Sequence, residues 1–488
     1  MKKKILMLTI GWVCVFCYGK TETRKPASDL KAPAAVIITM DPAKIYQPID
    51  GFGASLTDSS AWLLANAMSQ SQRRAALQEL FDPKTGIGLT YLRQPMGTSD
   101  FRVSSSMGGH DDYTYDDMPK GKSDYKLSHF SIAKDEKYII PMLKKIVEVS
   151  PAVKIMGSPW SAPHWMKEGE TLGGGRLKDD VYDTYALYFA KYIEAYAKHG
   201  LTIHAVTMQN EPQFEPGSYH GTRMDPPDQI KLARTMGPLL KTRHPDVKIL
   251  IWDHNWDMPE FPIEVLNDDQ AKAYITGSAF HHYGGNPKAQ TQVHTLHPDR
   301  EIHFTEGSNG EWQPPGFDTN LIGTTRSMID ILRNWSRTFI MWNLALDTEN
   351  GPKISGGCDT CYGVITVDRS DGSFSRRPQY YTFGHSSKFV RPGAYRIDST
   401  DTGNDNIKNV AFVNTDRSRV IIALNTDSSP HLISVNCTAR SLDYLLPARS
   451  VATFVWNDQP EAAVQAWLTT GDQTKLLSRQ TDVLFSEQ

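Results

Sequence analysis

The segment HAVTMQNEP, residues 204–212, is a short and mostly apolar run that leads into Glu211. A second segment of the same kind, IHFTEG at residues 302–307, leads into Glu306. An acidic side chain at the carboxyl end of a strand is where a parallel barrel assembles its chemistry. We therefore predict that both segments are barrel strands, and that the two glutamates form a carboxylate pair able to break a glycosidic bond.

The sequence on either side of these segments repeats the same alternation. Between about residues 46 and 350, short apolar runs alternate with longer amphipathic ones, which is typical of βα units around a parallel sheet. Eight strands are predicted, at residues 49–53, 89–93, 154–158, 204–208, 247–252, 277–281, 302–305 and 338–342. The fold class is therefore predicted to be α/β, with a (β/α)8 TIM barrel over residues 46–385.

One of the intervening helices is predicted in detail. From Asp183 to His199, aromatic and aliphatic residues recur at steps of three and four, which is the period of a helix with one buried face. The helix is predicted to begin at Asp183, acting as its cap, and to stop at Gly200. Its aromatic stripe is expected to pack against the barrel.

After residue 385 the pattern of apolar and polar residues changes. β-rich runs at residues 410–414, 420–425 and 450–456 are separated by turn residues. Their spacing predicts a small antiparallel β-sandwich over residues 386–457. Residues 458–488 are polar and are expected to form a helical or loosely attached C-terminal tail.

Charge and the amino terminus bear on partners and location. The chain of 488 residues has 52 Lys and Arg against 55 Asp and Glu, a net charge of −3. This balance gives no electrostatic footprint for nucleic acid, and neither a nucleic-acid partner nor an obligate protein partner is expected. Lys2, Lys3 and Lys4 precede an apolar run, which predicts a signal peptide over residues 1–19. We expect a secreted or periplasmic protein, with a lipid anchor on Cys17 as the alternative.

Two of the remaining cysteines are close together, at Cys358 and Cys361. Their spacing is that of half a zinc site, but no second pair or histidine cluster completes it. In an oxidising compartment, a disulfide that closes a small loop is the better interpretation. No cofactor is expected.

The two glutamates are predicted to divide the work of glycoside cleavage, which passes through an oxocarbenium-like transition state. Glu211 is assigned as the general acid/base, because Asn210 beside it supplies an amide for a sugar 2-hydroxyl and Pro212 fixes the turn. Glu306 is assigned as the nucleophile. Burial near a second negative charge is expected to raise the pKa of the acid and so to make the two groups chemically distinct.

Several motifs, in order from about residue 48 to 456, resemble family 30 of the glycoside hydrolases. They are GFGASLTD (51–58), LRQPMGTSDF (92–101), SPWSAPHWMK (158–167), NEP (210–212), TEG (305–307) and WNLAL (342–346). The resemblance implies a (β/α)8 barrel with an appended β-sandwich that also takes a strand from residues 20–45. It implies net retention of anomeric configuration through a glycosyl-enzyme intermediate, with Glu211 as acid/base and Glu306 as nucleophile.

The resemblance also implies five supporting residues. Asp100, Trp160 and Trp342 match residues that bind the sugar, Arg93 matches an arginine that steadies the nucleophile, and Tyr283 matches the tyrosine after strand six. Elementary chemistry agrees with these roles. An arginine fork keeps a carboxylate ionised, tryptophan faces suit the C–H side of a pyranose, and an ionised aspartate accepts from sugar hydroxyls.

His281 and His282 invite a metal interpretation, but neighbouring residues on a strand point to opposite faces, and no metal site is predicted. In the glucocerebrosidase of the family, an aromatic ring stands at the position of His282. That difference and the Cys358–Cys361 loop lie where preference for the leaving group should be set.

The predicted activity is hydrolysis of β-linked glucose in a β-glucan or glucoside substrate. A glucosylceramidase-like β-glucosidase and an endo-β-1,6-glucanase both remain open. A xylanase-type member is a third possibility, although no basic motif for a uronic acid branch is evident. The alternatives of another class are a non-catalytic carbohydrate-binding barrel, which intact Glu211 and Glu306 argue against, and a metal-dependent hydrolase, for which no convincing ligand set exists.

Overall fold

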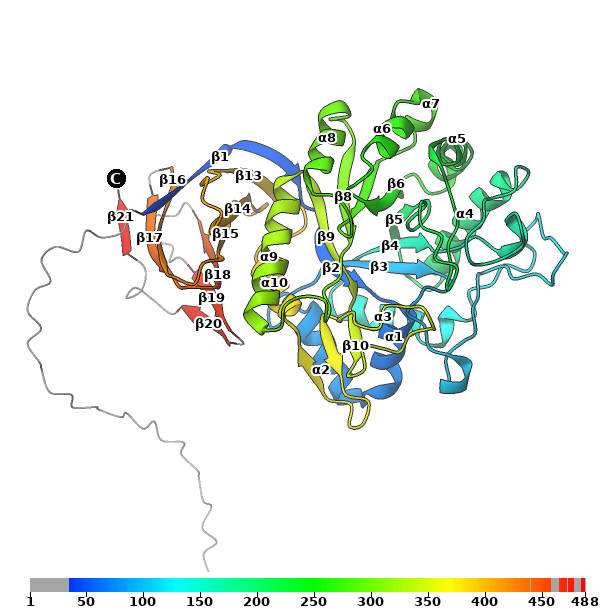
Figure 1. Ribbon diagram of the computed structural model, residues 1–488, viewed down its shortest axis with the longest axis horizontal. Coiled ribbons are helices and arrows are strands. Elements are labelled where there is room, and N and C mark those ends of the chain that lie inside the picture. Colours follow the sequence, from blue (N-terminus) through cyan, green and yellow to red (C-terminus); the bar gives the residue numbers. More distant parts are fainter. Residues whose placement is uncertain (1–34, 439, 458–464, 472, 478–483, 488) are drawn as a thin grey trace, which may run out of the picture. The chain divides into compact units, whose positions relative to one another are not determined.

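The computed structural model describes residues 35–438, 440–457, 465–471, 473–477 and 484–487 (Figure 1). The predicted signal peptide over residues 1–19, including Cys17, lies outside the described residues. Within the described part of the chain, no helix combines the length and the apolar character needed to cross a bilayer.

Eight parallel strands close into a barrel. They are β2 (Gly51–Ser55), β3 (Tyr91–Met96), β4 (Lys154–Pro159), β5 (Ile203–Thr207), β6 (Lys248–Asn255), β7 (Gly277–His281), β8 (Glu301–Glu306) and β9 (Ser336–Asn343). Parallel pairing of β9 with β2 closes the ring. All eight predicted strands are confirmed, and their near-continuous apolar runs are explained by burial on both faces. β6 differs at its end, since it continues past Trp252 through three polar residues to Asn255.

Helices follow the barrel strands and cover the barrel. They are α1 (Asp58–Trp62), α2 (Gln70–Phe81), α3 (Ile139–Val149), α4 (Tyr182–Lys198), α5 (Pro226–Arg243), α6 (Glu260–Leu266), α7 (Asp269–Lys272), α8 (Lys288–Leu296), α9 (Phe317–Arg333) and α10 (Pro378–Ser386). A small sheet of β10 (Ala345–Asp347), β11 (Ile365–Val367) and β12 (Phe374–Arg376) follows β9.

The helix predicted from Asp183 is α4, and its aromatic stripe is buried as expected. The predicted cap is wrong. The N-cap is Val181, which has no side-chain capping bond, and Asp183 instead lies in the first turn, where a negative charge complements the helix dipole. The helix stops where expected, since Gly200 adopts a left-handed φ of 77° just past its end.

The remaining strands form the β-sandwich. They are β1 (Val36–Pro48), β13 (Tyr395–Ser399), β14 (Ile407–Val413), β15 (Arg419–Asn425), β16 (His431–Cys437), β17 (Arg440–Leu446), β18 (Ser450–Trp456), β19 (Gln465–Thr470), β20 (Gln473–Leu477) and β21 (Leu484–Glu487). β1 lies between β13 and β16, so a segment before the barrel does contribute a strand. Ile38, Ile421, Leu442 and Phe454 share the core of this part.

The expectation of a helical C-terminal tail is wrong for the described residues. β19 pairs antiparallel with β18 and β20 extends the same edge, while β21 pairs with β17. The physical reason is the period of two at the start of this segment. Ala466 is buried in the sandwich core and Leu468 packs against it, so alternate residues face inward, as in a strand.

Candidate active site

Glu211 and Glu306 lie at the carboxyl-terminal end of the barrel, just after β5 and at the end of β8. One carboxylate oxygen of each and one ring nitrogen of His281 all lie within 4.8 Å of one another. The peptide N–H of Glu211 donates to the carbonyl of Asp253 at 3.0 Å, and Glu211 has a left-handed φ of 44°. This turn directs the Glu211 side chain inward, so the structure brings together the two carboxylates that the sequence paired.

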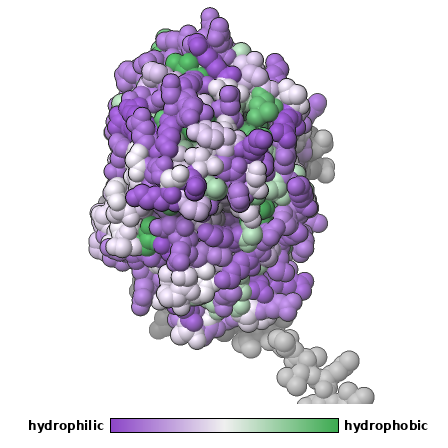
Figure 2. All heavy atoms as spheres, turned by 90° about the vertical axis from the view of Figure 1, so that its right-hand side faces the viewer, coloured by the Kyte–Doolittle hydropathy of each residue, from purple (hydrophilic) through white to green (hydrophobic). Residues whose placement is uncertain are grey.

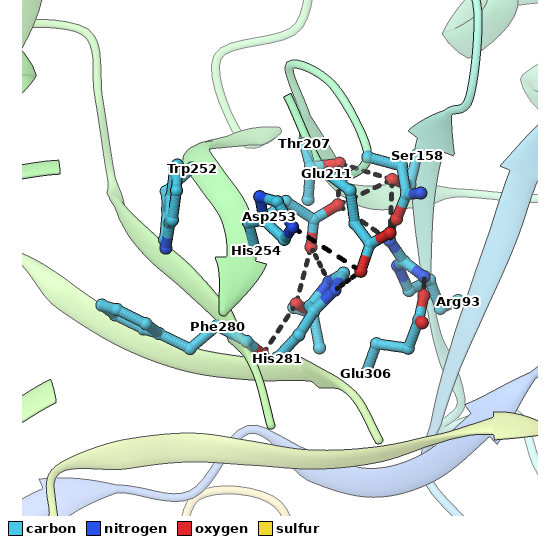
Figure 3. Close-up of polar contacts among 12 residues, drawn as sticks. Arg93, Ser158, Thr207, Glu211, Trp252, Asp253, His254, Phe280, His281 and Glu306 are labelled. Atoms are coloured by element: carbon cyan, nitrogen blue, oxygen red, sulfur yellow. Dashed lines mark hydrogen bonds and ion pairs between the residues drawn. The ribbon is translucent and has the colours of Figure 1, made fainter. Parts of the chain in front are cut away.

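Arg93, on β3, is fully buried beneath the pair. Its Nη1 donates to Glu306 Oε2, and its Nη2 donates to Asp253 Oδ2 at 2.8 Å (Figure 3). Nη2 also donates to Asn210 Oδ1 at 2.7 Å. The guanidinium therefore fixes the positions of Glu306 and of the amide beside Glu211 with one rigid group.

Asp253, on β6, is the centre of the network and was not predicted from the sequence. It is fully buried and accepts from Arg93, from His281 at 3.0 Å, and from three hydroxyl groups. Those hydroxyls belong to Ser158 (2.8 Å), Thr207 (2.7 Å) and Thr305 (2.6 Å). Burial alone would raise the pKa of Asp253, but Arg93 and His281 hold it well below its usual range. Asp253 is therefore an ionised anchor for both cations.

His281, at the end of β7, connects Asp253 to Glu211. Its Nε2 lies 3.0 Å from Asp253 Oδ1 and its Nδ1 lies 3.2 Å from Glu211 Oε1, as Figure 3 shows. Burial would lower the pKa of this imidazole, but the charges of Glu306 and Asp253 and its two hydrogen bonds raise the pKa to about 9. At neutral pH, the ring is therefore protonated and donates to both carboxylates.

The pKa values of the two glutamates move in opposite directions, and not in the expected ones. Burial raises the pKa of Glu306, and the charge of Glu211 adds to this effect against the opposing influence of His281 and Arg93. Burial would also raise the pKa of Glu211, but the hydrogen bond and charge of His281 lower it. The expectation that Glu211 has the raised pKa is therefore wrong for the free protein, because it left out the protonated histidine beside Glu211.

Two tryptophans line the site next to Arg93. Trp160 follows β4 and Trp342 lies near the end of β9, and their rings stack with centroids 4.9 Å apart. The Arg93 guanidinium carbon lies 4.8 Å from the Trp160 ring centroid. Asp100, after β3, is nearly buried, and burial together with the charge of Glu306 raises its pKa to about 8. At neutral pH, Asp100 is therefore mostly protonated, and it can donate to a sugar hydroxyl as well as accept from one.

The remaining predicted residues also reach the pair. The Tyr283 hydroxyl donates to Glu306 Oε1 at 2.8 Å, although the residue as a whole is 45% exposed. The side-chain oxygen of Asn210, Oδ1, accepts from Arg93, which leaves the side-chain NH₂ group of Asn210 to donate elsewhere. Ser308 Oγ lies 3.0 Å from the Tyr283 hydroxyl and was not singled out from the sequence.

Cys358 and Cys361 form a disulfide in the loop between β10 and β11. Cys361 packs in a cluster with Phe101, Trp160 and Trp342. The same loop touches the Asp100 segment, because the N–H of Ile354 donates to the Asp100 carbonyl at 3.0 Å. The disulfide loop therefore packs behind the tryptophans and supports the wall of the site.

Within the part of the chain that the structure describes, two groups of side chains have metal-ligand chemistry at close range. They are Glu211 with His281 and Glu306, and Asp50 with Glu301 and His303. In the first, His281 is protonated and has no lone pair for an ion. In the second, the Lys248 ammonium donates to Asp50 at 2.8 Å and to Glu301 at 2.7 Å. Cations of the chain itself already balance both sets of carboxylates, which disfavours a metal ion at either.

Asp253 was missed because the strand was predicted to stop at Trp252. β6 continues through Asp253 and His254 with a bulge in its pairing to β7, and both Trp252 and Asp253 have left-handed φ values, of 69° and 61°. A signal was available, since Asp253 follows an apolar run in the same way as Glu211 and Glu306. His281 was noticed only as a metal candidate.

The chain matches two family models. The Glycosyl hydrolase family 30 TIM-barrel domain matches residues 49–390, and the Glycosyl hydrolase family 30 beta sandwich domain matches residues 393–454. These boundaries agree with the barrel and the sandwich of the structure.

The relatives of the chain include proteins named as endo-1,6-beta-D-glucanases and proteins named as glucosylceramidases. The chain is 31% identical over 436 residues to Endo-1,6-beta-D-glucanase neg1 of Aspergillus fumigatus, covering 84% of this chain and 85% of that protein. It is 30% identical over 447 residues to the Lysosomal acid glucosylceramidase of Mus musculus, covering 87% and 84%. A solved endo-beta1,6-glucanase, BT3312, is 33% identical with a TM-score of 0.80, covering 86% of this chain and 94% of that one. With both domains matched in order, the chain belongs to glycoside hydrolase family 30.

Proposed function

We propose that this protein is a retaining β-glycosidase that hydrolyses β-linked glucosides by double displacement. The observation that carries the proposal is the close approach of the two carboxylates, with an oxygen of each within 4.8 Å of the other. Retaining enzymes keep their two carboxyl groups about 5–5.5 Å apart, whereas inverting enzymes leave room of about 6.5–9.5 Å for a water.

In the first step, Glu306 attacks the anomeric carbon while Glu211 gives its proton to the departing oxygen, so the glycosidic bond breaks and a glycosyl ester forms. In the second step, Glu211 takes a proton from water, and the hydroxide replaces Glu306 at the same carbon. Arg93 and Tyr283 donate to Glu306 and so stabilise the carboxylate when it attacks and when it leaves.

Glu211 must be protonated to act as the acid, but His281 lowers its pKa and keeps it ionised in the free protein. A bound glucoside displaces water from Glu211 and leaves it more deeply buried, which raises its pKa. Glu306 meanwhile keeps the hydrogen bonds that it accepts from Arg93 and Tyr283. We therefore propose that binding of the substrate moves the proton balance of the pair toward protonated Glu211.

β-1,6-Linked glucan is the first candidate substrate, supported by the names of the Aspergillus relative and of the solved structure at 33% identity. Glucosylceramide is the second candidate, supported by the name of the mouse relative. Incubating the protein with each and analysing the products separates the two candidates.

A covalent trap tests the mechanism. A 2-deoxy-2-fluoro-β-glucoside with an activated leaving group should add one sugar to the intact protein, on a peptide that contains Glu306. The variant Glu306→Gln should lose both labelling and turnover, whereas the matched control Glu264→Gln, at an exposed position of α6, should keep both. Label on another residue, or an α-anomer as the first product of a β-glucoside, would contradict double displacement.

We also propose that the chain is exported, on the strength of Lys2, Lys3 and Lys4 before an apolar run. Expressed with its natural amino terminus, the protein should be recovered outside the cytoplasm, with a new amino terminus near residue 20. A full-length chain in the cytoplasm would contradict this proposal, and a lipid on Cys17 would replace secretion with anchoring.

A further inference from the structure

A pocket in the loops that follow the barrel strands has no part in the chemistry described so far. Its volume is about 540 Å³, and it is lined by Asp112, Lys120, His164, residues 170–173 and residues 217–220. These segments follow β3, β4 and β5, so the pocket is built from loops at the same end of the barrel as Glu211 and Glu306.

Tyr219 is the wall that the pocket shares with the active site. The residue lines the pocket and also packs against the cluster that contains Phe101, Trp160 and Trp342. Burial raises the pKa of its hydroxyl, and the negative charges of Asp100, Glu211 and Glu306 add to the effect. A chain of sugars that occupies the active site can therefore reach the pocket across Tyr219.

Lys167 fixes two walls of the pocket in place. Its fully buried ammonium donates to the carbonyls of Leu172 at 3.0 Å, Gly174 at 2.7 Å and Gly221 at 2.7 Å. It thereby joins the loop after β4 to the loop after β5. Burial lowers its pKa to about 7, so the lysine is held in an unfavourable place for its charge. A buried lysine bonded only to carbonyls indicates a pocket that is formed before any ligand arrives.

His220 is a buried polar residue of the pocket lining. The side chain is 97% buried, and its Nδ1 lies 3.0 Å from the Thr98 carbonyl. Its Nε2 lies 3.6 Å from Asp112 Oδ2, within ion-pair distance, so the histidine connects the Thr98 segment to a carboxylate of the pocket lining.

The lining carries both negatively and positively charged side chains. Asp112 and Glu170 offer carboxylates, Lys120 offers an ammonium, and Tyr219 offers a ring. A pocket for an anion or a cation would carry one sign, and a pocket for a lipid chain would be apolar. Hydroxyl groups both donate and accept, so a neutral sugar ring matches this lining. Figure 2, which faces the loops after β3, shows a mostly hydrophilic surface with hydrophobic residues in separate small patches.

We propose that this pocket binds a second hexose of the substrate, so that the preferred substrate is a β-linked gluco-oligosaccharide or glucan and not a glucoside of an apolar alcohol. The proposal rests on the proposed function, since it concerns the same substrate chain.

Thr171 allows the pocket to be blocked without touching the active site. It is an exposed residue of the pocket wall, and Thr171→Trp fills the space with a large ring. The matched control is Thr295→Trp, at an exposed position on α8. Lys120→Ala is a second variant that removes a donor from an exposed position of the lining.

Purified full-length chains are assayed for kcat/KM on 4-nitrophenyl β-glucoside, which has one sugar, and on the β-linked trisaccharides gentiotriose, laminaritriose and cellotriose. Thr171→Trp should lower kcat/KM for the best trisaccharide at least tenfold and for the aryl glucoside less than twofold. Lys120→Ala should lower the trisaccharide value about threefold, and Thr295→Trp should change neither.

The possible failures are distinguishable. The second-sugar subsite is overturned if the unaltered protein cleaves the aryl glucoside but no trisaccharide. It is also overturned if Thr171→Trp lowers kcat/KM equally for both kinds of substrate or for neither. In both cases the glycosidase proposal stands. If the unaltered protein cleaves no glucoside at all, the proposed function fails and the subsite fails with it.

Discussion

Arg93 and Asp253 form an ion pair that solvent does not reach, with Arg93 Nη2 2.8 Å from Asp253 Oδ2 and both side chains fully buried. The same guanidinium donates to Glu306, and the same aspartate accepts from His281 beside Glu211. Each glutamate is therefore linked to Asp253 through one cation. The two carboxylates to which we assign the chemistry are positioned by a single residue that contacts neither of them through its side chain.

Asp253→Asn should lower both activity and stability. An amide keeps the size of the side chain but removes the charge that balances Arg93 and His281, and breaking a buried ion pair costs about 3–5 kcal/mol. Misplacement of a catalytic group by about 1 Å can cost about 100-fold in rate. We therefore expect kcat for an aryl glucoside to fall about 100-fold and urea unfolding to show a loss of a few kcal/mol. The control Asp269→Asn, at an exposed position of α7, should leave both unchanged. A variant at Asp253 with unchanged kcat would show that the network is not needed for positioning.

His281→Gln should shift the pH profile to higher pH. The protonated ring lowers the pKa of Glu211 and opposes the rise in the pKa of Glu306, so its removal should raise both. The acidic limb of kcat/KM, which reports ionisation in the free enzyme, should therefore move upward by about one pKa unit, equivalent to about 1.4 kcal/mol.

His282→Gln is the matched control for this shift. Burial lowers the pKa of His282 to about 4, so its ring is neutral near pH 7, and it faces Ser308 instead of the carboxylates. Its replacement changes no charge, and the profile should stay in place. An equal shift in both variants would mean that the effect of His281 is structural and not electrostatic.

The sequence predicted the barrel well because parallel strands buried on both faces are short apolar runs, and these are visible without contacts. It predicted the positions of Glu211 and Glu306 for the same reason, as each follows such a run. β16 and β17 were not singled out. His431–Cys437 alternates polar and apolar residues and was overshadowed by the stronger runs of β15 and β18.

The electrostatics of the site were not predictable in the same way. The pKa direction of Glu211 depends on His281, which is 70 residues away in the chain, and on the 3.2 Å distance that the fold creates. Asp253 gains its role from a bulge in β6, and no local pattern marks a bulge with left-handed φ at two residues that are not glycine. Spacing along the chain indicates which groups meet, but the charge that each carries depends on all its neighbours.

Glu211→Ala should discriminate between leaving groups. Acid assistance matters most when the departing alkoxide is basic, so kcat/KM should fall at least 1000-fold for gentiobiose and far less for 2,4-dinitrophenyl β-glucoside. Removing the carboxylate also opens a space in which azide can attack the glycosyl intermediate, and added azide should restore turnover with formation of a β-glucosyl azide. Equal losses for both substrates, or an α-azide product, would remove Glu211 from the acid/base role.

Asp135→Asn should change how stability depends on pH. Asp135 is fully buried and accepts from the hydroxyls of Tyr113, Tyr115 and Tyr196, each at 2.7 Å. Burial raises its pKa to about 6, against 3.8 for the ordinary carboxyl. Between these values the folded chain binds more protons than the unfolded chain, so folding stability falls as pH rises through this window. The asparagine has no charge to desolvate. The free energy of unfolding of the variant, relative to that of the natural chain, should therefore rise by about 3 kcal/mol between pH 4 and pH 7.

The measurement is the free energy of urea unfolding at several pH values, with Asp246→Asn as a control at an exposed position. The control should follow the natural chain at every pH. Since Asp58 also has a pKa raised by burial to about 6, part of the decline should persist in Asp135→Asn. If the difference between the natural chain and Asp135→Asn is the same at pH 4 and pH 7, then the carboxyl titrates near its ordinary pKa, and the three tyrosine hydroxyls fully offset its burial.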